Sequence, residues 1–323
     1  MNRQKQNEII KALGDMVACF SVPVNPADLS NLNARTDTVE ALYWALQDAK
    51  RGESEAWRDA FSKLQGVLFH TLKSNELDIE RLDLDFYLEV PYSIIGEGNS
   101  KLGFLTFSVC PFVTCPGAGD CLKYCYSPKA WRYPAAFARQ VQNTILLLST
   151  LGRQLITLAL DEQLARPKYA KRDRIDFRLY VDGDFDSVQS LHYWMETIRA
   201  RPQLAAYGYS KSFHEFLGYD AALELHGQKW PSNYVLNLSG GHNHSAPVVA
   251  AMRALSITRG AFVAVELPKG SPKQNTREQR AVLRDTYGKK AFTCPGKCGD
   301  CTPAGHACGS RRFQGRDIII AAH

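Results

Sequence analysis

The sequence IDFRLYVDGDFDS, residues 175–187, contains a strand pattern, a polar turn and a helix start in immediate succession. Apolar residues alternate with more polar ones at its beginning, which predicts a strand over 175–181. The motif Asp182-Gly183-Asp184-Phe185 then interrupts the alternation, and Ser187 is a favourable N-cap for a helix that extends to about Ala200. A strand followed by a polar loop and a helix is the repeating unit of α/β folds.

The same unit recurs on both sides of this stretch. Strands are predicted at 102–109, 205–209, 234–238 and 261–266, and helices within 135–165, at 213–225 and near 247–255. Strands and helices that alternate at this length imply parallel strands joined by helices. The predicted fold class is therefore α/β, as a partial (β/α) barrel or an open parallel sheet of about five or six strands. Several loops should then gather at one edge of the sheet, where such folds carry their sites.

Two further regions flank this core in the predicted domain organisation. Residues 1–95 contain apolar residues at helical spacing, such as Ile9 and Leu13, and are predicted to form a helical accessory region. Residues 96–290 form the α/β core with a cysteine-bearing loop, and residues 291–323 form a Cys-rich metal-binding tail.

Length and hydropathy argue against a membrane protein. The longest apolar stretches, such as 145–148, are far shorter than the roughly 18 to 20 residues of a membrane span. The N-terminus lacks the apolar core and the cleavage site of a secretory signal. We therefore expect a cytoplasmic protein without membrane contact, a setting in which clustered cysteines are more often metal ligands than disulfides.

Charge is distributed unevenly along the 323 residues. The chain has 39 Lys and Arg against 33 Asp and Glu, a net charge of +6. Residues 1–95 carry a net charge of −5 and the remainder +11, so the basic character belongs to the cysteine-bearing part. A positive surface favours an anionic small molecule or nucleic acid as partner, and the linker with Lys168, Lys171 and Arg174 is a candidate phosphate contact. A linker that is simply solvated is the alternative interpretation.

Eight of the nine cysteines fall into two clusters, and the ninth, Cys19, is expected to be a small core residue. In the first cluster Cys115, Cys121 and Cys125 follow the first strand of the core with the spacing C-x5-C-x3-C. Three thiolates on one loop can hold three corners of a [4Fe-4S] cluster and leave the fourth iron open to a ligand. Together with Cys110, four thiolates can instead close a tetrahedral zinc site.

The second cluster, Cys294, Cys298, Cys301 and Cys308, places four cysteines within 15 residues. Such a density indicates a metal site, either a second iron–sulfur cluster or zinc. A metal site with four thiolate ligands has no open coordination position. Such a site either assists catalysis as an auxiliary cluster or serves only to fold the last residues.

Two loops at predicted strand ends add further candidate ligands. Gly183 permits close backbone approach and Asp184 can accept from an amine or bind a cation, although an ordinary strand-to-helix turn explains the same motif. In Ser239-Gly240-Gly241-His242-Asn243-His244, the two histidines are either ligands or solvent-facing hydrogen bonders. The sequence contains no phosphate loop, dinucleotide fingerprint or nucleophile elbow.

A three-cysteine loop after the first barrel strand, followed by an acidic strand end with a glycine, resembles the architecture of radical S-adenosylmethionine enzymes. That class usually carries C-x3-C-x2-C at this position, so the resemblance is one of architecture and not of motif. It implies that Gly183 and Asp184 orient the cofactor. It also implies that Lys211 faces the carboxylate of the cofactor or an anionic substrate.

A second resemblance rests on the order of several short motifs. These are Thr114-Cys115-Pro116-Gly117-Ala118, Cys121, Cys125-Tyr126, Arg139, Asn143-Thr144, Gly183-Asp184-Phe185, Tyr209-Ser210-Lys211-Ser212 and Cys294 with Cys298-Gly299-Asp300-Cys301. From near Leu102 to its C-terminus the chain is similar to the phage and plasmid family called gene product 88. The resemblance implies mobile-element origin and a cysteine-bound metal centre. Because that family does not normally carry cysteine at the position of Cys110, this residue is left out of the first-choice ligand set.

The sequence thus predicts an iron–sulfur protein of a mobile genetic element, with one or two [4Fe-4S] clusters. The catalytic hypothesis is a radical S-adenosylmethionine-like enzyme whose cluster is held by Cys115, Cys121 and Cys125 at the barrel mouth. The alternative hypothesis is a non-catalytic iron–sulfur or zinc metalloprotein that binds nucleic acid or a host protein through its basic region.

Overall fold

The computed structural model describes most of the chain from residue 93 onward. The described residues are 93–100, 102–111, 114–123, 125–127, seven positions between 136 and 147, 150–265, 267, 276–287, 291–296, 298–299, 301 and 306–321. The predicted helical region at 1–95 lies almost entirely outside the described residues, and so does Cys19. The division of the chain at residues 95 and 290 therefore stays a prediction.

The chain divides into two compact units that interleave in sequence. The first comprises Met1–Ile94, Val109–Val113 and Ser127–Ile156, and the second comprises Ile95–Ser108, Thr114–Tyr126 and Thr157–His323. The second unit contains the sheet and both sets of candidate cysteine ligands.

Cys110 belongs to the first unit and is buried there. Its backbone N–H donates to Thr144 Oγ1 at 2.8 Å, and the Thr144 hydroxyl donates to the carbonyl of Gln140 at 2.7 Å. The cysteine that the family pattern leaves out thus belongs to a different unit from Cys115, Cys121 and Cys125.

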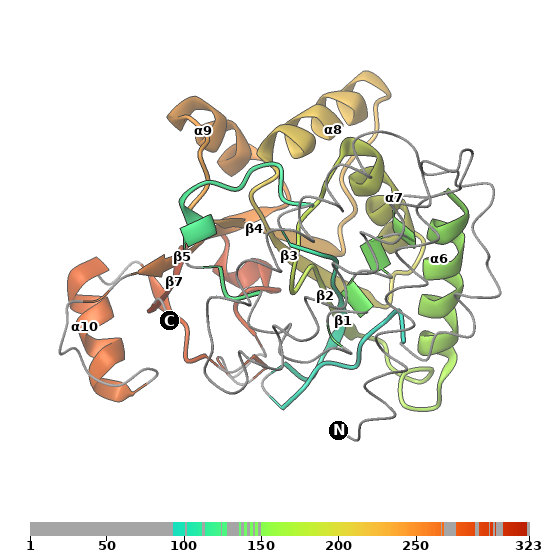
Figure 1. The fold of residues 1–323 in the computed structure, drawn as a ribbon, viewed down its shortest axis with the longest axis horizontal. Coiled ribbons are helices and arrows are strands. Elements are labelled where there is room, and N and C mark those ends of the chain that lie inside the picture. The colour runs from blue at the N-terminus through green and yellow to red at the C-terminus, as the bar shows by residue number, and fades with distance from the viewer. Residues whose placement is uncertain are drawn as a thin grey trace, which may run out of the picture. The chain divides into compact units, whose positions relative to one another are not determined.

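Seven parallel strands form the sheet of the second unit. They are β1 (Leu105–Phe107), β2 (Ile175–Leu179), β3 (Leu204–Ser210), β4 (Tyr234–Ser239), β5 (Thr258–Val265), β6 (Phe292–Thr293) and β7 (Ile318–Ala321). The order is β1-β2-β3-β4-β5-β7-β6, and every pair is parallel. Figure 1 shows β1 to β5 side by side in chain order. The α/β class and the open parallel sheet are confirmed.

Helices follow the strands as the alternation predicts. They are α6 (Thr150–Ala165), α7 (Val188–Arg199), α8 (Phe213–Leu225), α9 (Ala246–Ala254) and α10 (Arg277–Tyr287), with short 3-10 helices η2 (Asp120–Lys123) and η4 (Arg311–Phe313). Ser187 caps α7 as predicted, because its side chain accepts from the Ser190 N–H at 3.2 Å. Among the helices that the structure describes, none combines the length and the apolar composition of a membrane span.

Alternation along the strands gives the sheet two different faces. Phe177 in β2 and Phe107 in β1 point to the side where Trp194 of α7 packs, with ring centroids 5.8 and 4.8 Å from the indole. We call this side the helix face. Arg178, the residue after Phe177, points to the opposite side, where its guanidinium lies 4.7 Å from the centre of the Tyr209 ring. We call this side the tail face.

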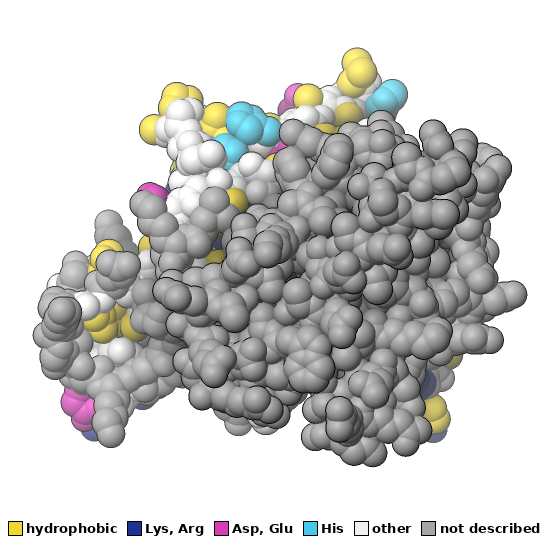
Figure 2. Space-filling model, in the orientation of Figure 1, with side chains coloured by type: hydrophobic (Ala, Val, Ile, Leu, Met, Phe, Trp, Pro, Cys, Tyr) yellow, Lys and Arg dark blue, Asp and Glu magenta, His cyan; other side chains and the backbone are white. Residues whose placement is uncertain are grey.

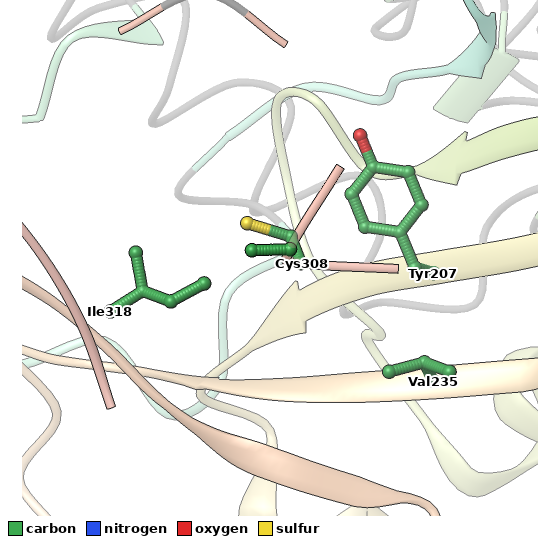
Figure 3. Close-up of a cluster of buried hydrophobic side chains, with 5 residues drawn as sticks. Tyr207, Val235, Cys308 and Ile318 are labelled. Carbon is green, nitrogen blue, oxygen red and sulfur yellow. The ribbon is translucent and has the colours of Figure 1, made fainter. Parts of the chain in front are cut away.

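Residues of the Cys-rich tail pack directly on the tail face. Cys308 and Ala307 form a buried cluster with Tyr207, Val235 and Ile318, from β3, β4 and β7. Figure 3 shows four of these side chains in one group, with Tyr207 and Val235 on neighbouring strands. The tail also supplies β6 and β7, so it is part of the sheet as well as a cover for it.

Strand β2 ends at Leu179, two residues before the predicted end, because the backbone turns sharply at Tyr180. Tyr180 has φ = 53°, a left-handed conformation that is uncommon for a non-glycine residue. Its ring therefore returns to the helix face, where it contacts Phe107 and Phe185, and its hydroxyl accepts from Trp194 Nε1 at 3.0 Å. Gly183 follows with φ = 82°. This double turn directs the Asp182–Asp184 segment across the end of the sheet.

The helix face supplies a matched test of core packing. Leu191 in α7 is fully buried, whereas Leu225 at the end of α8 is 82% exposed. Leu191→Ala should lower the free energy of unfolding by about 2 to 5 kcal/mol, because it removes buried methyl groups and leaves a cavity. Leu225→Ala should change it by less than about 0.5 kcal/mol. Urea denaturation of both variants measures this, and equal losses would contradict the described packing of α7.

Candidate functional site

The first cysteine loop, residues 114–126, lies over the carboxyl ends of three neighbouring strands. At the end of β2 the Tyr126 hydroxyl donates to the carbonyl of Val181 at 2.5 Å. The Asp184 N–H donates to Thr114 Oγ1 at 3.3 Å. These two bonds fix the loop at both of its ends, on either side of the three cysteines.

The end of β3 approaches the same loop at Gly117. A Cβ atom placed on Gly117 would lie 1.7 Å from the Lys211 carbonyl oxygen and 2.8 Å from His244 Nε2. Only glycine fits this approach. His244 Nε2 lies 2.6 Å from the same carbonyl and must donate to it, since a carbonyl oxygen only accepts. The Lys211 carbonyl therefore joins the loop to the segment that follows β4.

The end of β4 makes the third contact. The Cys121 N–H donates to the carbonyl of Gly241 at 3.0 Å, and Ala118 pairs with His242 in an isolated antiparallel bridge. A Cβ on Gly119 would lie 2.8 Å from the backbone of both His242 and Asn243. The expectation that several loops gather at one edge is confirmed for β2, β3 and β4.

Asp184 connects the end of β2 to the end of β3. Its Oδ1 accepts from the Ser210 hydroxyl at 2.6 Å and from the Phe185 N–H at 2.8 Å, and its Oδ2 accepts from the Lys211 N–H at 2.6 Å. The side chain is buried, and this burial raises the pKa of Asp184 although the bonds from Lys211 and Ser210 lower it. In the structure, Asp184 thus positions Lys211 through its backbone. Its predicted role in orienting a cofactor stays a prediction.

The Lys211 ammonium group lies at the edge of this assembly. Nζ donates to the Ser239 hydroxyl at 2.9 Å, and the side chain is half-buried. An ammonium group has three donors, so this bond orients the group and leaves capacity for an anion. The Lys211 carbonyl lies next to the cysteine loop, and the predicted binding of an anion by its side chain stays a prediction.

His242 and His244 are half-buried hydrogen bonders within the loop after β4. His242 Nδ1 accepts from the His244 N–H at 3.2 Å, and the His244 ring stacks on Phe213 at 4.6 Å. Burial lowers the pKa of His242, and the nearby His244 and Lys211 lower it further. Histidine side chains are visible at the surface around α8 and α9 (Figure 2). These contacts assign the two rings a structural role in holding the loop.

Three of the tail cysteines lie at the tail face of the sheet. Cys308 is buried, and Cys294 and Cys301 pack against the same cluster. The neighbouring Cys298 and Cys301 raise the pKa of Cys294, and Cys294 and Cys298 raise that of Cys308, both in addition to the larger effect of burial. Burial raises the pKa of Cys294 to about 11 and that of Cys308 to about 12. Thiols in this setting stay protonated near neutral pH unless a cation replaces the proton.

Backbone and side-chain donors already surround these sulfur atoms. The Gly296 N–H donates to Cys294 Sγ at 3.4 Å, and the Ala307 N–H donates to Cys301 Sγ at 3.2 Å. The Tyr209 hydroxyl hydrogen-bonds the Cys308 thiol and lowers its pKa against the effect of burial. Donors directed at sulfur are the usual surroundings of metal-bound thiolates.

Buried polar side chains fix the tail to the strands. Asn237 in β4 donates through Nδ2 to the carbonyl of Cys308 at 3.0 Å, and its Oδ1 accepts from Arg259 Nε at 2.6 Å. His306 lies 3.1 Å from Asp176 Oδ1 through Nε2, and its Nδ1 accepts from the Gly309 N–H at 3.1 Å. Burial raises the pKa of Asp176, but the bond from His306 and the charge of Arg174 lower it overall.

No group of three or more His, Cys, Asp or Glu side chains in the described part of the chain stands in an arrangement that could hold a metal ion. The structure places residues of both cysteine sets at the sheet. The binding of iron–sulfur clusters or zinc by these residues stays a prediction. Eight cysteines are described, all as thiols.

The interpretation of the sequence assigns no individual role to three residues of the tail face: Arg178, Tyr207 and Tyr209. Each falls in a predicted strand, and the period of two places Tyr207 and Tyr209 on one side of β3. This period is visible in the sequence. It does not reveal that Ala307 and Cys308, about 100 residues later, pack on this side of the sheet.

The close approach of Gly117 to its neighbours can be tested by the addition of a single carbon atom. Gly117→Ala should displace the loop from the ends of β3 and β4, because the new Cβ overlaps the Lys211 carbonyl. We expect a loss of about 1 to 3 kcal/mol in unfolding free energy. Gly103→Ala is the matched control, since a Cβ at Gly103 meets nothing within 4 Å. Thermal unfolding of both variants measures the difference, and a Gly117→Ala variant as stable as the control would refute the close approach.

Comparisons with known proteins complete the description. A search of curated proteins gave no significant match, and neither did a search of solved structures. The family model described as gene product 88 matches residues 92–317, which include the loop, the strand ends and all four tail cysteines. The match gives no support to the architectural resemblance to radical S-adenosylmethionine enzymes, which stays a prediction. Because the match covers more than half of the sequence, it confirms the other resemblance: the chain belongs to the gene product 88 family.

Proposed function

We propose that this protein is an iron–sulfur protein with two cysteine-bound [4Fe-4S] clusters. Cys115, Cys121 and Cys125 hold the first, and the four tail cysteines hold the second. The family is phage-related, so the proposal places this chemistry in a mobile genetic element. The observation that carries it is the attachment of a three-cysteine loop to the ends of β2, β3 and β4.

The loop suits a cluster with one open iron. Thiolate sulfur is the ligand that iron–sulfur clusters use, and three thiolates leave one iron without a protein ligand. The side chains of Cys115, Cys121 and Cys125 are half-buried. The Thr114 and Tyr126 bonds to the β2 exit fix the backbone on both sides of them. A loop that is already fixed loses little further conformational freedom when it binds a cluster, which favours affinity.

The tail suits a closed cluster. Cys308 is buried, the other three tail cysteines are half-buried, and N–H groups donate to two of the sulfur atoms. Zinc satisfies the same ligand set, so metal analysis must separate the two.

We further propose that S-adenosylmethionine is the ligand of the open iron. When bound, cluster and cofactor together supply reductive cleavage of the cofactor, which activates otherwise inert substrate positions. Lys211 Nζ, oriented by Ser239, binds the carboxylate of the cofactor or of an anionic substrate. Asp184 acts as a positioning residue, because it holds the Lys211 backbone from the end of β2. Gly183 leaves room for the cofactor beside that turn.

Binding of nucleic acid through the basic linker has weaker support. Arg166 and Lys168 pair with Glu97 at 3.0 and 2.8 Å, and Arg174 pairs with Asp176 at 2.9 Å. These partners neutralise cations that phosphates would otherwise attract. We therefore place the anionic ligand at Lys211 and not at the linker.

Anaerobic purification tests the clusters. The intact protein should be brown and contain iron and sulfide, and Cys121→Ala should remove about four irons per chain. Cys301→Ala should remove about the same amount from the other set. Cys110→Ala is the control, because Cys110 lies in the other unit, and it should keep the full iron content. Zinc without iron in both sets would overturn the proposal.

Cofactor chemistry is tested on the reduced, iron-loaded protein. It should release methionine from S-adenosylmethionine, and Lys211→Met should weaken cofactor binding by about tenfold or more, since a charge-assisted bond is lost. Lys229→Met removes an equivalent charge from an exposed position and should bind as the parent does. If the loaded parent protein neither binds nor cleaves the cofactor, the enzymatic part of the proposal fails while the clusters remain.

A further inference from the structure

In the part of the chain that the structure describes, the Lys211 ammonium group has a hydroxyl partner and no carboxylate partner. Its Nζ donates to Ser239 Oγ at 2.9 Å, while Asp184 accepts from the Lys211 backbone and not from the ammonium group. By contrast, Arg253 pairs with Asp317 through two bonds of 3.1 and 3.0 Å. The ammonium group has three donors, so two of them can bind an anion from solution.

The bond to Lys211 also determines what Ser239 can offer a ligand. An ammonium group has donors and no acceptor, so Ser239 Oγ must be the acceptor in this bond. The proton of the Ser239 hydroxyl can then donate to a further acceptor. Ser239 is the last residue of β4 and is partly exposed. A ligand that approaches the carboxyl end of β4 can therefore accept from this hydroxyl.

His242 supplies a third donor. The backbone turns at Gly241, where φ is 75°, and the His242 ring lies 4.8 Å from the Phe213 ring. Its Nδ1 accepts from the His244 N–H, so the neutral ring carries its proton on Nε2, which can donate. Burial, His244 and Lys211 all lower the pKa of His242, which favours the neutral ring. His242 is partly exposed, so its Nε2 proton can reach a ligand.

Backbone and ring contacts hold the three donors at the same edge of the sheet. Ser210 pairs with Leu238 in the β3–β4 register, so Lys211 and Ser239 both follow this pair directly. His244 Nε2 donates to the Lys211 carbonyl at 2.6 Å, and the His244 N–H bond to His242 Nδ1 is 3.2 Å long. The segment after β4 is thus fixed to the segment after β3.

We propose that Lys211, Ser239 and His242 bind the phosphate group of a phosphate monoester. One ammonium, one hydroxyl and one imidazole proton match its three terminal oxygen atoms, and its charge of about −1.5 to −2 suits a site with a cation. A carboxylate or a phosphodiester has two such oxygens and a single negative charge. The remaining ammonium proton stays available for the cofactor carboxylate. The inference rests on the proposed function, in which Lys211 binds an anion, and it identifies the substrate as a phosphorylated molecule.

Isothermal titration calorimetry of the full chain with methyl phosphate, without S-adenosylmethionine, measures the site. The parent protein should bind methyl phosphate about tenfold more tightly than dimethyl phosphate or acetate, since both lack the third oxygen and the second charge. Lys211→Met should weaken binding by about tenfold or more, and Ser239→Ala and His242→Phe by about fivefold each. Phenylalanine keeps a ring against Phe213. Ser239→Thr keeps the hydroxyl and should restore the affinity that Ser239→Ala loses.

Lys229→Met, Ser256→Ala and His226→Gln are the matched controls, because all three residues are exposed, and they should bind methyl phosphate as the parent does. A parent protein that does not bind methyl phosphate overturns the inference, and so do site variants that bind as tightly as these controls.

Two other outcomes overturn the assignment to a monoester. Equal affinity for acetate would leave Lys211 as the carboxylate site of the proposed function, and equal affinity for dimethyl phosphate would indicate a nucleic-acid backbone. Iron content is measured separately, so the failure of this inference leaves the proposed clusters standing. Conversely, a chain that binds methyl phosphate but no iron would keep the phosphate site and remove the proposed function.

Discussion

The buried carboxylate of Asp184 ties the exit of β2 to the exit of β3, and the candidate site depends on this link. Its two oxygens accept from Ser210 and from the Lys211 backbone, both at 2.6 Å. The Lys211 carbonyl then packs on Gly117 and accepts from His244. The interactions therefore run from β2 through β3 to the cysteine loop and the end of β4. The loss of one hydrogen-bond partner would leave the buried carboxylate with an uncompensated charge. We therefore expect the loss of one of these contacts to weaken the others.

The two faces of the sheet differ in the kinds of side chain that they bury. The helix face is apolar and aromatic, with Trp194 against Phe107 and Phe177, and it stabilises the fold by burial. The tail face carries polar and charged groups in its interior, among them Asn237 and Arg259. Buried polar groups cost free energy unless they are paired. Asn237 and Arg259 meet this cost by hydrogen-bonding each other.

Much of the fold follows from local patterns. The period of two in β2, the cap at Ser187 and the apolar spacing of α8 all predict elements that the structure contains with nearly the same limits. Local patterns do not predict the left-handed turn at Tyr180, because nothing in its side chain favours that conformation and only its packing against Phe107 and Phe185 stabilises it. Helix α10 was not predicted either, since polar and charged residues make up most of its sequence and Leu283 is its one fully buried apolar side chain among the described residues.

The candidate site was predictable to the same degree. Cysteine spacing identifies both candidate ligand sets, and the loops at the strand ends contain the candidate residues Asp184 and Lys211. Sequence cannot reveal that Tyr207 packs in one buried cluster with Cys308, because this contact joins segments distant in the chain through the packing of the tail. Non-local contacts of this kind arise from tertiary structure and leave no periodic signal.

Strand β7 has a consequence for biosynthesis. It pairs with β5 on one side and with β6 on the other, although its residues, Ile318–Ala321, come at the end of the described chain. A nascent chain therefore presents this edge of β5 without its β7 partner until residues 318–321 have left the ribosome, and unpaired edges invite aggregation. The same late segment brings Cys294 into place, since the Cys294 N–H donates to the carbonyl of Ile319 at 2.8 Å. The pairing of β7 and the positioning of Cys294 thus depend on the same contact.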